Sequence, residues 1–327
     1  MNRTVQTSVE RFPIAGSFTI SRGAKTEADV VCCILTDGRV TGRGECVPYK
    51  RYGESIESVV AQIEAMKTAL ETGLSADQLQ HVMPYGAARN AVDCALHDLE
   101  AKTTGRRVAE ALCSSAPKPL ETAYTISLGD PDTMAANARQ WAHRSLLKIK
   151  VGTGDDESRI RAVRAAAPRS KIILDANEGW TDDNLQRHLR ICAELGISLI
   201  EQPLHQGHDG LLARIQRPVP VCADESVHAT SDLVGLKDRY DAINIKLDKA
   251  GGLTEALRMK AEARRLGFQI MVGCMVGTSL AMAPAVLLAQ DADYVDLDGP
   301  LLLARDREPA LTYSASMVFP PDPSLWG

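Results

Sequence analysis

The chain has 327 residues, 45% of them apolar, and a formal net charge of −5. This length can hold one large domain and a smaller one, with ample material for a core. The charge forms no basic stripe or acidic tail, which argues against nucleic acid or a membrane surface as a partner. The start lacks the apolar stretch of a secretion signal, and no later run would span a bilayer, so we expect a cytoplasmic protein that acts on a small molecule.

The first part of the chain alternates like antiparallel strands and then becomes helical. Asp37-Gly38 is a hairpin signal between two of the alternating runs. We expect strands at 4–11, 29–36 and 39–46 and helices at 55–71, 76–81 and 86–102. These elements predict a small α+β capping domain over residues 1–117. Two polar loops within it, Ser21–Glu27 and Val47–Glu54, are either a lid or ordinary surface.

The sequence pattern changes near residue 118, where short apolar runs begin to alternate with amphipathic helical segments. The eight runs are 123–127, 146–151, 172–175, 197–201, 219–223, 242–246, 268–272 and 294–297. Strand alternating with helix in this way predicts a (β/α)8-type barrel, in the modified form (β/α)7β, over residues 118–299. An open doubly wound sheet is the alternative, but no Gly-rich turn follows the first strand. We expect residues 300–327 to return to the capping domain.

Three acidic residues close three consecutive runs: Asp175, Glu201 and Asp224. In a parallel barrel the carboxyl ends of the strands carry the chemistry. One such acid alone is more often solvated or a helix cap, whereas three in succession predict a metal site. All-oxygen ligands favour a hard cation, Mg²⁺ with Mn²⁺ as a substitute. Asn177 is the expected supporting residue beside Asp175.

Lysines stand at the ends of the strands that flank these three. Lys148 and Lys150 share one strand face, and Lys246 shares a face with Asn244 on the opposite side of the barrel. Any one of them alone would be read as a solvated lysine. A second lysine and a dication nearby are expected to lower a lysine pKa toward the range of a general base.

This arrangement suits one reaction type. A metal ion holds a substrate carboxylate, one lysine removes the α-proton, and a second lysine on the opposite face returns it. The outcome is a 1,1-proton transfer.

Several long motifs resemble the enolase superfamily, in its muconate-lactonising subgroup, over essentially the whole chain. Within that subgroup the chain is most similar to dipeptide epimerases, including those that act on L-Ala-D/L-Glu. The motifs are GECVPYKRYGES at 44–55, GAARNAVDCALHDLEA at 86–101, CADES at 222–226, NIKLDKAGGLTEAL at 244–257 and DLDGP at 296–300.

The resemblance implies roles for individual residues. Lys150 and Lys246 become the acid/base pair, with Lys148 lowering the pKa of Lys150, and the three acids become ligands of one Mg²⁺ per subunit. Asp296 and Asp298 are implied to bind the free ammonium of a dipeptide, and Thr125 to line the pocket. A homo-oligomer is compatible with the sequence.

One departure concerns the substrate. Similar epimerases carry an arginine in the lid loop to meet an acidic second residue, and this chain has Lys25 there, three residues after Arg22. Lysine keeps the charge but loses the two-pronged geometry. An acidic second residue is expected, with relaxed preference as the alternative.

Other activities stay open on the sequence. Epimerases for other dipeptides, cycloisomerases, N-acylamino acid racemases and o-succinylbenzoate synthases share the lysine and metal pattern, but Asp296 and Asp298 argue against those that need no ammonium site. Acid-sugar dehydratases would need a histidine at the seventh strand end, where Met271–Cys274 stands. An imine-forming lyase would not need three metal carboxylates, and a non-catalytic protein would be expected to lose one of these residues.

Overall fold

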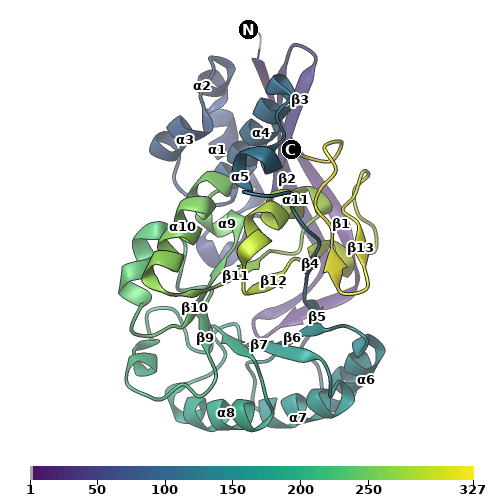
Figure 1. Ribbon diagram of the computed structural model, residues 1–327, viewed down its shortest axis with the longest axis vertical. Coiled ribbons are helices and arrows are strands. Elements are labelled where there is room, and N and C mark those ends of the chain that lie inside the picture. The colour runs from purple at the N-terminus through teal and green to yellow at the C-terminus, as the bar shows by residue number, and fades with distance from the viewer. Residues whose placement is uncertain (1–2) are drawn as a thin grey trace.

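Eight parallel strands form the centre of the molecule. The structure is a computed structural model and describes residues 3–327. The strands are hydrogen-bonded in chain order from β5 to β12, and Ala123 N donates to Val295 O at 2.9 Å, which links the two ends of the sheet. Their bounds are β5 Tyr124–Ile126, β6 Leu146–Lys150, β7 Lys171–Asp175, β8 Leu199–Glu201, β9 Val221–Ala223, β10 Ala242–Ile245, β11 Gln269–Gly273 and β12 Tyr294–Asp296. The predicted barrel is therefore confirmed, and the open sheet is excluded (Figure 1).

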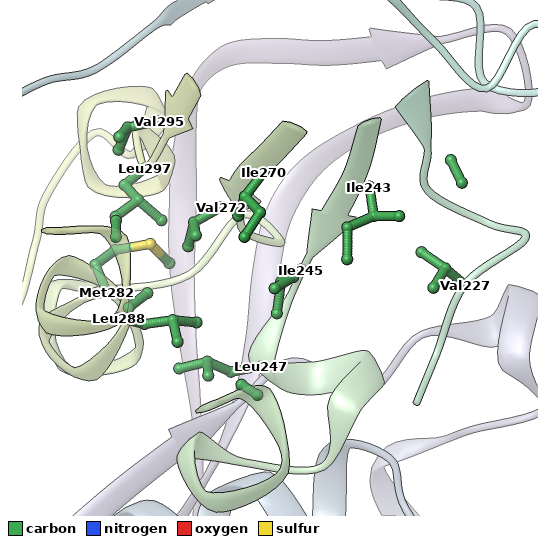
Figure 2. Packing of buried hydrophobic residues seen from close by; sticks show 14 of the residues in the cluster. Val227, Ile243, Ile245, Leu247, Ile270, Val272, Met282, Leu288, Val295 and Leu297 are labelled. Carbon is green, nitrogen blue, oxygen red and sulfur yellow. The ribbon is translucent and has the colours of Figure 1, made fainter. Parts of the chain in front are cut away.

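Side chains of the strands alternate between the barrel interior and the surrounding helices. Ile243 and Ile245 of β10 lie beside Ile270 and Val272 of β11, on the outer side of the sheet that the surrounding helices cover (Figure 2). The residues between them therefore face inward. This alternation places Asn244 and Lys246 on the interior side.

Helices cover the barrel, with two exceptions. They are α6 Pro131–Trp141, α7 Asp156–Ala166, α8 Asp182–Glu194, α9 Leu247–Ala250, α10 Leu253–Leu266 and α11 Ser279–Leu288. After β8 and β9 the chain forms only the 3-10 turns η2 Gly210–Ala213 and η3 Thr230–Leu236. Glycines at 207 and 210 and prolines at 203, 218 and 220 disfavour an α-helix in the first of these connections. Strand and helix thus alternate less regularly than predicted.

The cap is a three-stranded antiparallel sheet with helices on it. Strands β1 Arg3–Ile20 and β2 Gly23–Asp37 are longer than predicted, because the hairpin pairs with itself up to Ile20 and Gly23. The expected loop Ser21–Glu27 is therefore a tight turn followed by strand. The other elements are β3 Val40–Cys46, η1 Lys50–Tyr52, α1 Ile56–Ala65, α2 Lys67–Glu71, α3 Ala76–Val82, α4 Ala87–Thr104 and α5 Val108–Leu112.

Helix α4 packs tightly against β3 through two glycines. A Cβ at Gly44 would lie 2.1 Å from Ala91 O, and one at Gly42 would lie 2.4 Å from Ala95 O. Only glycine allows this approach. Helix α4 also reaches the barrel, where Arg89 donates to Ala250 O and Gly251 O at 2.8 and 3.0 Å.

The last residues lie beside the same helix. Trp326 Nε1 donates to Cys94 O at 3.1 Å, and Gly327 N donates to Asp98 Oδ1 at 2.8 Å. Earlier parts of this segment form η5 Gly299–Leu302 and the strands β13 Tyr313–Ser314 and β14 Met317–Val318. Strand β13 pairs with β14, and β14 pairs with β4 Leu120–Glu121. The 3-10 turn η4 spans Ala289–Asp291. The domain boundaries at 117 and 299 stay a prediction. Within residues 3–327, no helix is both long and apolar enough to cross a membrane.

Candidate active site

Charged side chains fill the carboxyl end of the barrel, and all of them are buried. The set with exposures of 8% or less comprises Lys148, Lys150, Asp175, Glu201, Asp224, Glu225, Lys246, Lys249, Asp296 and Asp298. Charges without water must be paired or hold a cation. The structure thus brings together the three predicted metal acids, the three predicted lysines and the Asp-x-Asp pair.

Lys148 lies at the centre of the cluster. Its Nζ is 2.7 Å from Asp296 Oδ2, 2.7 Å from Glu201 Oε2 and 3.1 Å from Asp175 Oδ2. The contact with Glu201 is an ion pair without hydrogen-bond geometry, since Glu201 Oε2 is buried with no hydrogen-bond partner. Glu201 Oε1 accepts from Asn244 Nδ2 at 2.7 Å.

The two lysines predicted as acid and base stand on either side of this centre. Lys150 Nζ donates to Asp175 Oδ2 at 2.6 Å, and Lys246 Nζ donates to Asp224 Oδ2 at 2.7 Å. The strands that carry them, β6 and β10, are separated by the three acid-bearing strands. The ring of Phe18, from the cap hairpin, lies over Lys150 with its centroid 5.5 Å from Nζ.

Nearby carboxylates shift the pKa values of two of the lysines. Burial lowers the pKa of Lys148, but the charges of Asp296, Glu201 and Asp175 outweigh burial and raise it well above its usual value. The pKa of Lys246 is likewise raised, because Asp224 and Glu201 outweigh burial. The expected lowering of a lysine pKa includes the effect of a bound dication, so it stays a prediction; without the cation, the closer carboxylates dominate these two lysines.

The acids divide into two kinds. Burial and the charge of Asp175 raise the pKa of Glu201 to about 7. Burial acts in the same direction on Asp175, but Lys150 and Lys148 hold its pKa below the usual range. Lys246 and Lys249 likewise lower the pKa of Asp224 despite its burial. The middle acid is therefore the one on which burial and the neighbouring acids outweigh the charges of Lys148 and Lys246.

The donor set fits a hard cation, although the acids are drawn onto lysines. Among residues 3–327, no three acidic, His or Cys side chains are grouped as metal ligands. Asp175, Glu201 and Asp224 nevertheless end three adjacent strands, are all buried, and offer only oxygen. Glu201 Oε2 accepts no hydrogen bond and is held only by its ion pair with Lys148, so it can offer a lone pair to a cation. These three residues would hold a divalent cation.

Asp296 and Asp298 occupy the edge of the cluster next to β5. Asp296 Oδ1 is buried without a partner, while Asp298 Oδ2 accepts from Thr125 N at 2.6 Å. Burial and the charge of Asp296 raise the pKa of Asp298 to about 7. Thr125 contributes its backbone here. Two buried carboxyl groups that share one lysine, Lys148 at 2.7 Å from Asp296 Oδ2, form an attractive place for a further cationic group.

Two loops of the cap reach the chain segment after Asp175. Arg22 donates to Asn177 O at 2.7 Å and to Glu225 Oε1 at 2.8 Å. Arg51 binds both carboxylate oxygens of Glu178 at 2.8 and 2.9 Å. Asn177 and Glu178 have φ of 44° and 66°, the left-handed region that non-glycine residues seldom adopt. The cap therefore holds a strained turn next to the site.

Of the two remaining predicted site residues, Asn177 contacts the buried cluster and Lys25 does not. Asn177 N donates to Asp175 Oδ1 at 3.0 Å, so its supporting contact is made by the backbone. Lys25 is exposed on β2, and its Nζ lies 5.2 Å from the centroid of the Tyr49 ring. The structure does not bring Lys25 into the buried cluster.

Sequence reasoning assigned no role to several residues that contact this site. Lys249 Nζ contacts Asp224 Oδ1 at 2.5 Å, and its position three residues after Lys246, before Gly251-Gly252, was the available signal. The others are Glu225, Arg51 and Glu178, whose contacts join segments far apart in the chain.

Two family models cover most of the chain. Residues 133–321 match the enolase C-terminal domain-like model, and residues 2–112 match the N-terminal domain model of mandelate racemase and muconate lactonizing enzyme. The chain therefore belongs to the enolase superfamily.

Two curated relatives indicate the class of activity. The chain is 45% identical to the L-Ala-D/L-Glu epimerase of Escherichia coli K12, over 95% of this chain and 98% of that one. It is 43% identical to an N-acetyl-D-glutamate racemase of a Pseudoalteromonas species, over 91% and 95%. The chain is thus an isomerase of the racemase and epimerase type.

Solved structures agree. An enolase family member from Agrobacterium tumefaciens with homology to dipeptide epimerases, with bound sodium, L-Ala-L-Glu and an ordered loop, superposes with a TM-score of 0.99. It is 66% identical, covering 99% of this chain and 100% of that one. A dipeptide epimerase from Enterococcus faecalis, complexed with Mg and L-Leu-L-Tyr, has a TM-score of 0.91 at 27% identity, covering 98% of each chain.

Proposed function

We propose that this protein is a Mg²⁺-dependent dipeptide epimerase that inverts the α-carbon of the second residue, with L-Ala-D/L-Glu as its substrate. The observation that carries the proposal is the placement of Lys150 and Lys246 on opposite sides of three buried acids, beside the unpartnered Asp296 Oδ1. Two findings support this choice of substrate: the 45% sequence identity with the Escherichia coli enzyme and the L-Ala-L-Glu bound in the Agrobacterium structure.

The cation is the first element of the proposal. Asp175, Glu201 and Asp224 would hold it, and the Mg in the Enterococcus faecalis complex supports its identity. Mn²⁺ is the expected substitute because it accepts the same oxygen ligands. When bound, Mg²⁺ supplies the positive charge that stabilises the enediolate form of the substrate carboxylate.

The chain's own residues move the proton. One lysine removes the α-proton of the second residue from one face, and the other lysine returns a proton to the opposite face. The base must be neutral, and Lys246 is protonated while Asp224 and Glu201 pair with it. Ligation of those acids would withdraw negative charge from the lysine and lower its pKa. Lys148, held by three carboxylates, stays charged and would not act as a further base.

The ends of the substrate are recognised separately. Asp296 and Asp298 would receive the ammonium of the first residue, and Thr125 N fixes the Asp298 carboxyl group. Lys25, on the cap hairpin above Tyr49, would meet an acidic second side chain once the hairpin covers the substrate. The proposal includes action in the cytoplasm on peptides recycled from the cell wall, which the family resemblance supports.

One observation favours a second candidate, racemisation of N-acetylglutamate, because the Pseudoalteromonas relative with that activity is 43% identical. That substrate has no ammonium, so the two buried carboxyl groups would face an uncharged amide. Two buried carboxyl groups that share one lysine would gain no positive partner from an apolar acetyl group, which is unfavourable. This difference makes the dipeptide the stronger candidate.

The test incubates the purified protein with Mg²⁺ and, separately, L-Ala-L-Glu, L-Ala-L-Leu and N-acetyl-L-glutamate, followed by chiral chromatography. We expect L-Ala-D-Glu from the first substrate, with lower turnover of the other two. Faster turnover of N-acetyl-L-glutamate would replace the proposal with the racemase, and no turnover of all three would remove both.

A further inference from the structure

Gln202, the residue after Glu201, has a backbone conformation that its type seldom adopts. Its φ is 35°, and it is completely buried. Non-glycine residues in this region persist where their surroundings force them, often at functional sites. Its contacts show what the conformation achieves.

The side-chain amide of Gln202 joins two strands beyond the end of their pairing. Its Oε1 accepts from the backbone N of Asp224 at 2.9 Å and of Ser226 at 3.1 Å. Its Nε2 lies 2.9 Å from each of three acceptors, which are Leu204 O, Ser226 Oγ and Tyr240 OH. Because the oxygen faces only N–H donors and the nitrogen faces acceptors, the orientation of the amide is fixed. A carboxylate or an apolar side chain could not make both sets of bonds.

A second layer of buried groups holds the acceptors of the amide in place. Asp209 Oδ2 accepts from Tyr240 OH at 2.7 Å and from Ser226 Oγ at 2.9 Å. Asp209 Oδ1 in turn accepts from Arg239 NH1 at 2.5 Å. Asp209 and Tyr240 are 1% and 2% exposed, so water does not compete for these bonds.

The spacing of Asp175 and Glu201 is set by strand pairing, whereas that of Glu201 and Asp224 is not. Asp175 and Glu201 are direct partners in the β7–β8 ladder. The β8–β9 ladder pairs Glu201 with Cys222 and ends there with Gln202 N donating to Cys222 O at 2.8 Å. Asp224 lies two residues further on, where the bond from its backbone N to Gln202 replaces the ladder.

We infer that Gln202 is a positioning residue that fixes the spacing of Glu201 and Asp224 for a divalent cation. It contacts neither the cation nor the substrate and acts through the backbone of Asp224. The inference rests on the proposed function for the role of the cation, and it adds the reason why the third acid stands at the correct distance from the second.

The test compares Gln202→Met with the wild-type protein and with Gln269→Met. Gln269 is an exposed glutamine at the opposite end of the barrel, on β11, so it is a matched control. Mn²⁺ affinity is measured by the EPR signal of free Mn²⁺, and thermal unfolding establishes that each variant is folded. We expect Gln202→Met to weaken Mn²⁺ binding about 10- to 100-fold, as for other groups that orient metal ligands, while Gln269→Met binds like wild type.

A kinetic readout separates positioning from general damage. In Gln202→Met the Mg²⁺ concentration for half-maximal epimerisation should rise, and kcat should recover at saturating Mg²⁺. If Gln202→Met does not fold, Tyr240→Phe keeps the ring and removes one acceptor of the amide, with an expected loss of about two- to tenfold in Mn²⁺ affinity. Wild-type affinity in a folded Gln202→Met, or in Tyr240→Phe when Gln202→Met is unfolded, would overturn the inference.

The same series distinguishes this inference from the proposed function. A wild-type protein that binds Mn²⁺ without epimerising any dipeptide contradicts the proposed function, and the affinities still decide on Gln202. A wild-type protein that binds no Mn²⁺ contradicts both.

Discussion

The barrel interior has two layers that differ in chemistry although the same strands build them. The layer at the amino ends is apolar and consists of Ala123, Leu146, Ile173, Leu199, Cys222, Ala242, Met271 and Tyr294. Two residues further along the chain from each of these stand Thr125, Lys148, Asp175, Glu201, Asp224, Asn244, Gly273 and Asp296. Residues two apart on a strand share a face, so each strand contributes one residue to the apolar layer and one to the polar layer.

The difference explains how the charges of the upper layer are held. The side chains of the apolar layer offer no charged partner to the charged layer above them. Each lysine and acid of the upper layer is therefore paired within that layer, with the cap, or with a ligand. Gly273 leaves room for this, because a Cβ there would lie 2.6 Å from Asn244 Oδ1. The lower layer stabilises the fold, and the upper layer is held ready for a cation and a substrate.

The largest effect is expected for Glu201→Gln, in the upper layer on β8. Loss of the Glu201 carboxylate, the middle one of the three acids, should weaken binding of the metal ion. This loss should reduce kcat/KM about 10³-fold, because charge stabilisation by a bound metal ion contributes several kcal/mol to the reaction. Dialysis of wild type against EDTA should abolish activity, and Mg²⁺ should restore it. Activity that survives both treatments would show that the three acids serve only the structure.

A substitution in the apolar layer, Leu199→Ala, should affect stability rather than activity. Leu199 lies two residues before Glu201 on the same strand. Truncation of a fully buried leucine should lower the free energy of unfolding by about 2–5 kcal/mol, while kcat of the folded protein changes little. Urea unfolding and kcat at 15 °C measure the two quantities. The exposed Val234→Ala is the control and should alter neither. A large loss of kcat with full stability in Leu199→Ala would contradict the division into layers.

A smaller effect, dependent on pH, is expected at Asp298. Its pKa in the free protein is about 7, so the group is neutral at pH 6 and charged at pH 8. KM for L-Ala-L-Glu should therefore fall as the pH rises from 6 to 8, because the charged carboxylate attracts the ammonium. Asp298→Asn should raise KM at pH 8 by about 10- to 100-fold, as for loss of a charge-assisted hydrogen bond, and should flatten this dependence.

N-acetyl-L-glutamate, which has no ammonium, serves as the control substrate for Asp298→Asn. Its KM should not rise in the variant. Equal increases for both substrates would mean that Asp298 supports the pocket rather than the ammonium.

The smallest effect is expected outside both layers, at the exposed Lys25. Lys25→Arg should improve kcat/KM for L-Ala-L-Glu by about two- to fivefold, since arginine binds a carboxylate in two-pronged fashion and an exposed ion pair contributes little. L-Ala-L-Leu is the control substrate and should show no change. An equal gain for both dipeptides would place the effect on hairpin closure instead of on recognition.

The sequence predicted the upper layer well because each residue in it follows from a strand period and a strand end. Asp175, Glu201 and Asp224 close consecutive apolar runs, and an eight-strand count makes those ends converge. The extent of the cap hairpin was not predictable in this way, since strand pairing at Ile20 and Gly23 needs no apolar pattern.

Contacts between distant segments were also beyond the sequence. Arg51 meets Glu178 across 127 positions of the chain, and no local pattern connects the two. The ion pairs of Lys148 were not predictable for the same reason: its carboxylate neighbours come from three other strands. Local period and spacing thus predict which residues point inward, whereas tertiary packing decides which of them touch.

The most direct test of the two-lysine site is ¹H NMR in D₂O with Mg²⁺, comparing wild type with Lys150→Met and Lys246→Met. L-Ala-L-Glu and L-Ala-D-Glu are followed separately by loss of the glutamyl α-proton signal. Wild type should exchange and interconvert both diastereomers, whereas each variant should exchange the α-proton of only one and interconvert neither. Exchange of both diastereomers by either variant would contradict the assignment of one lysine to each face of the α-carbon.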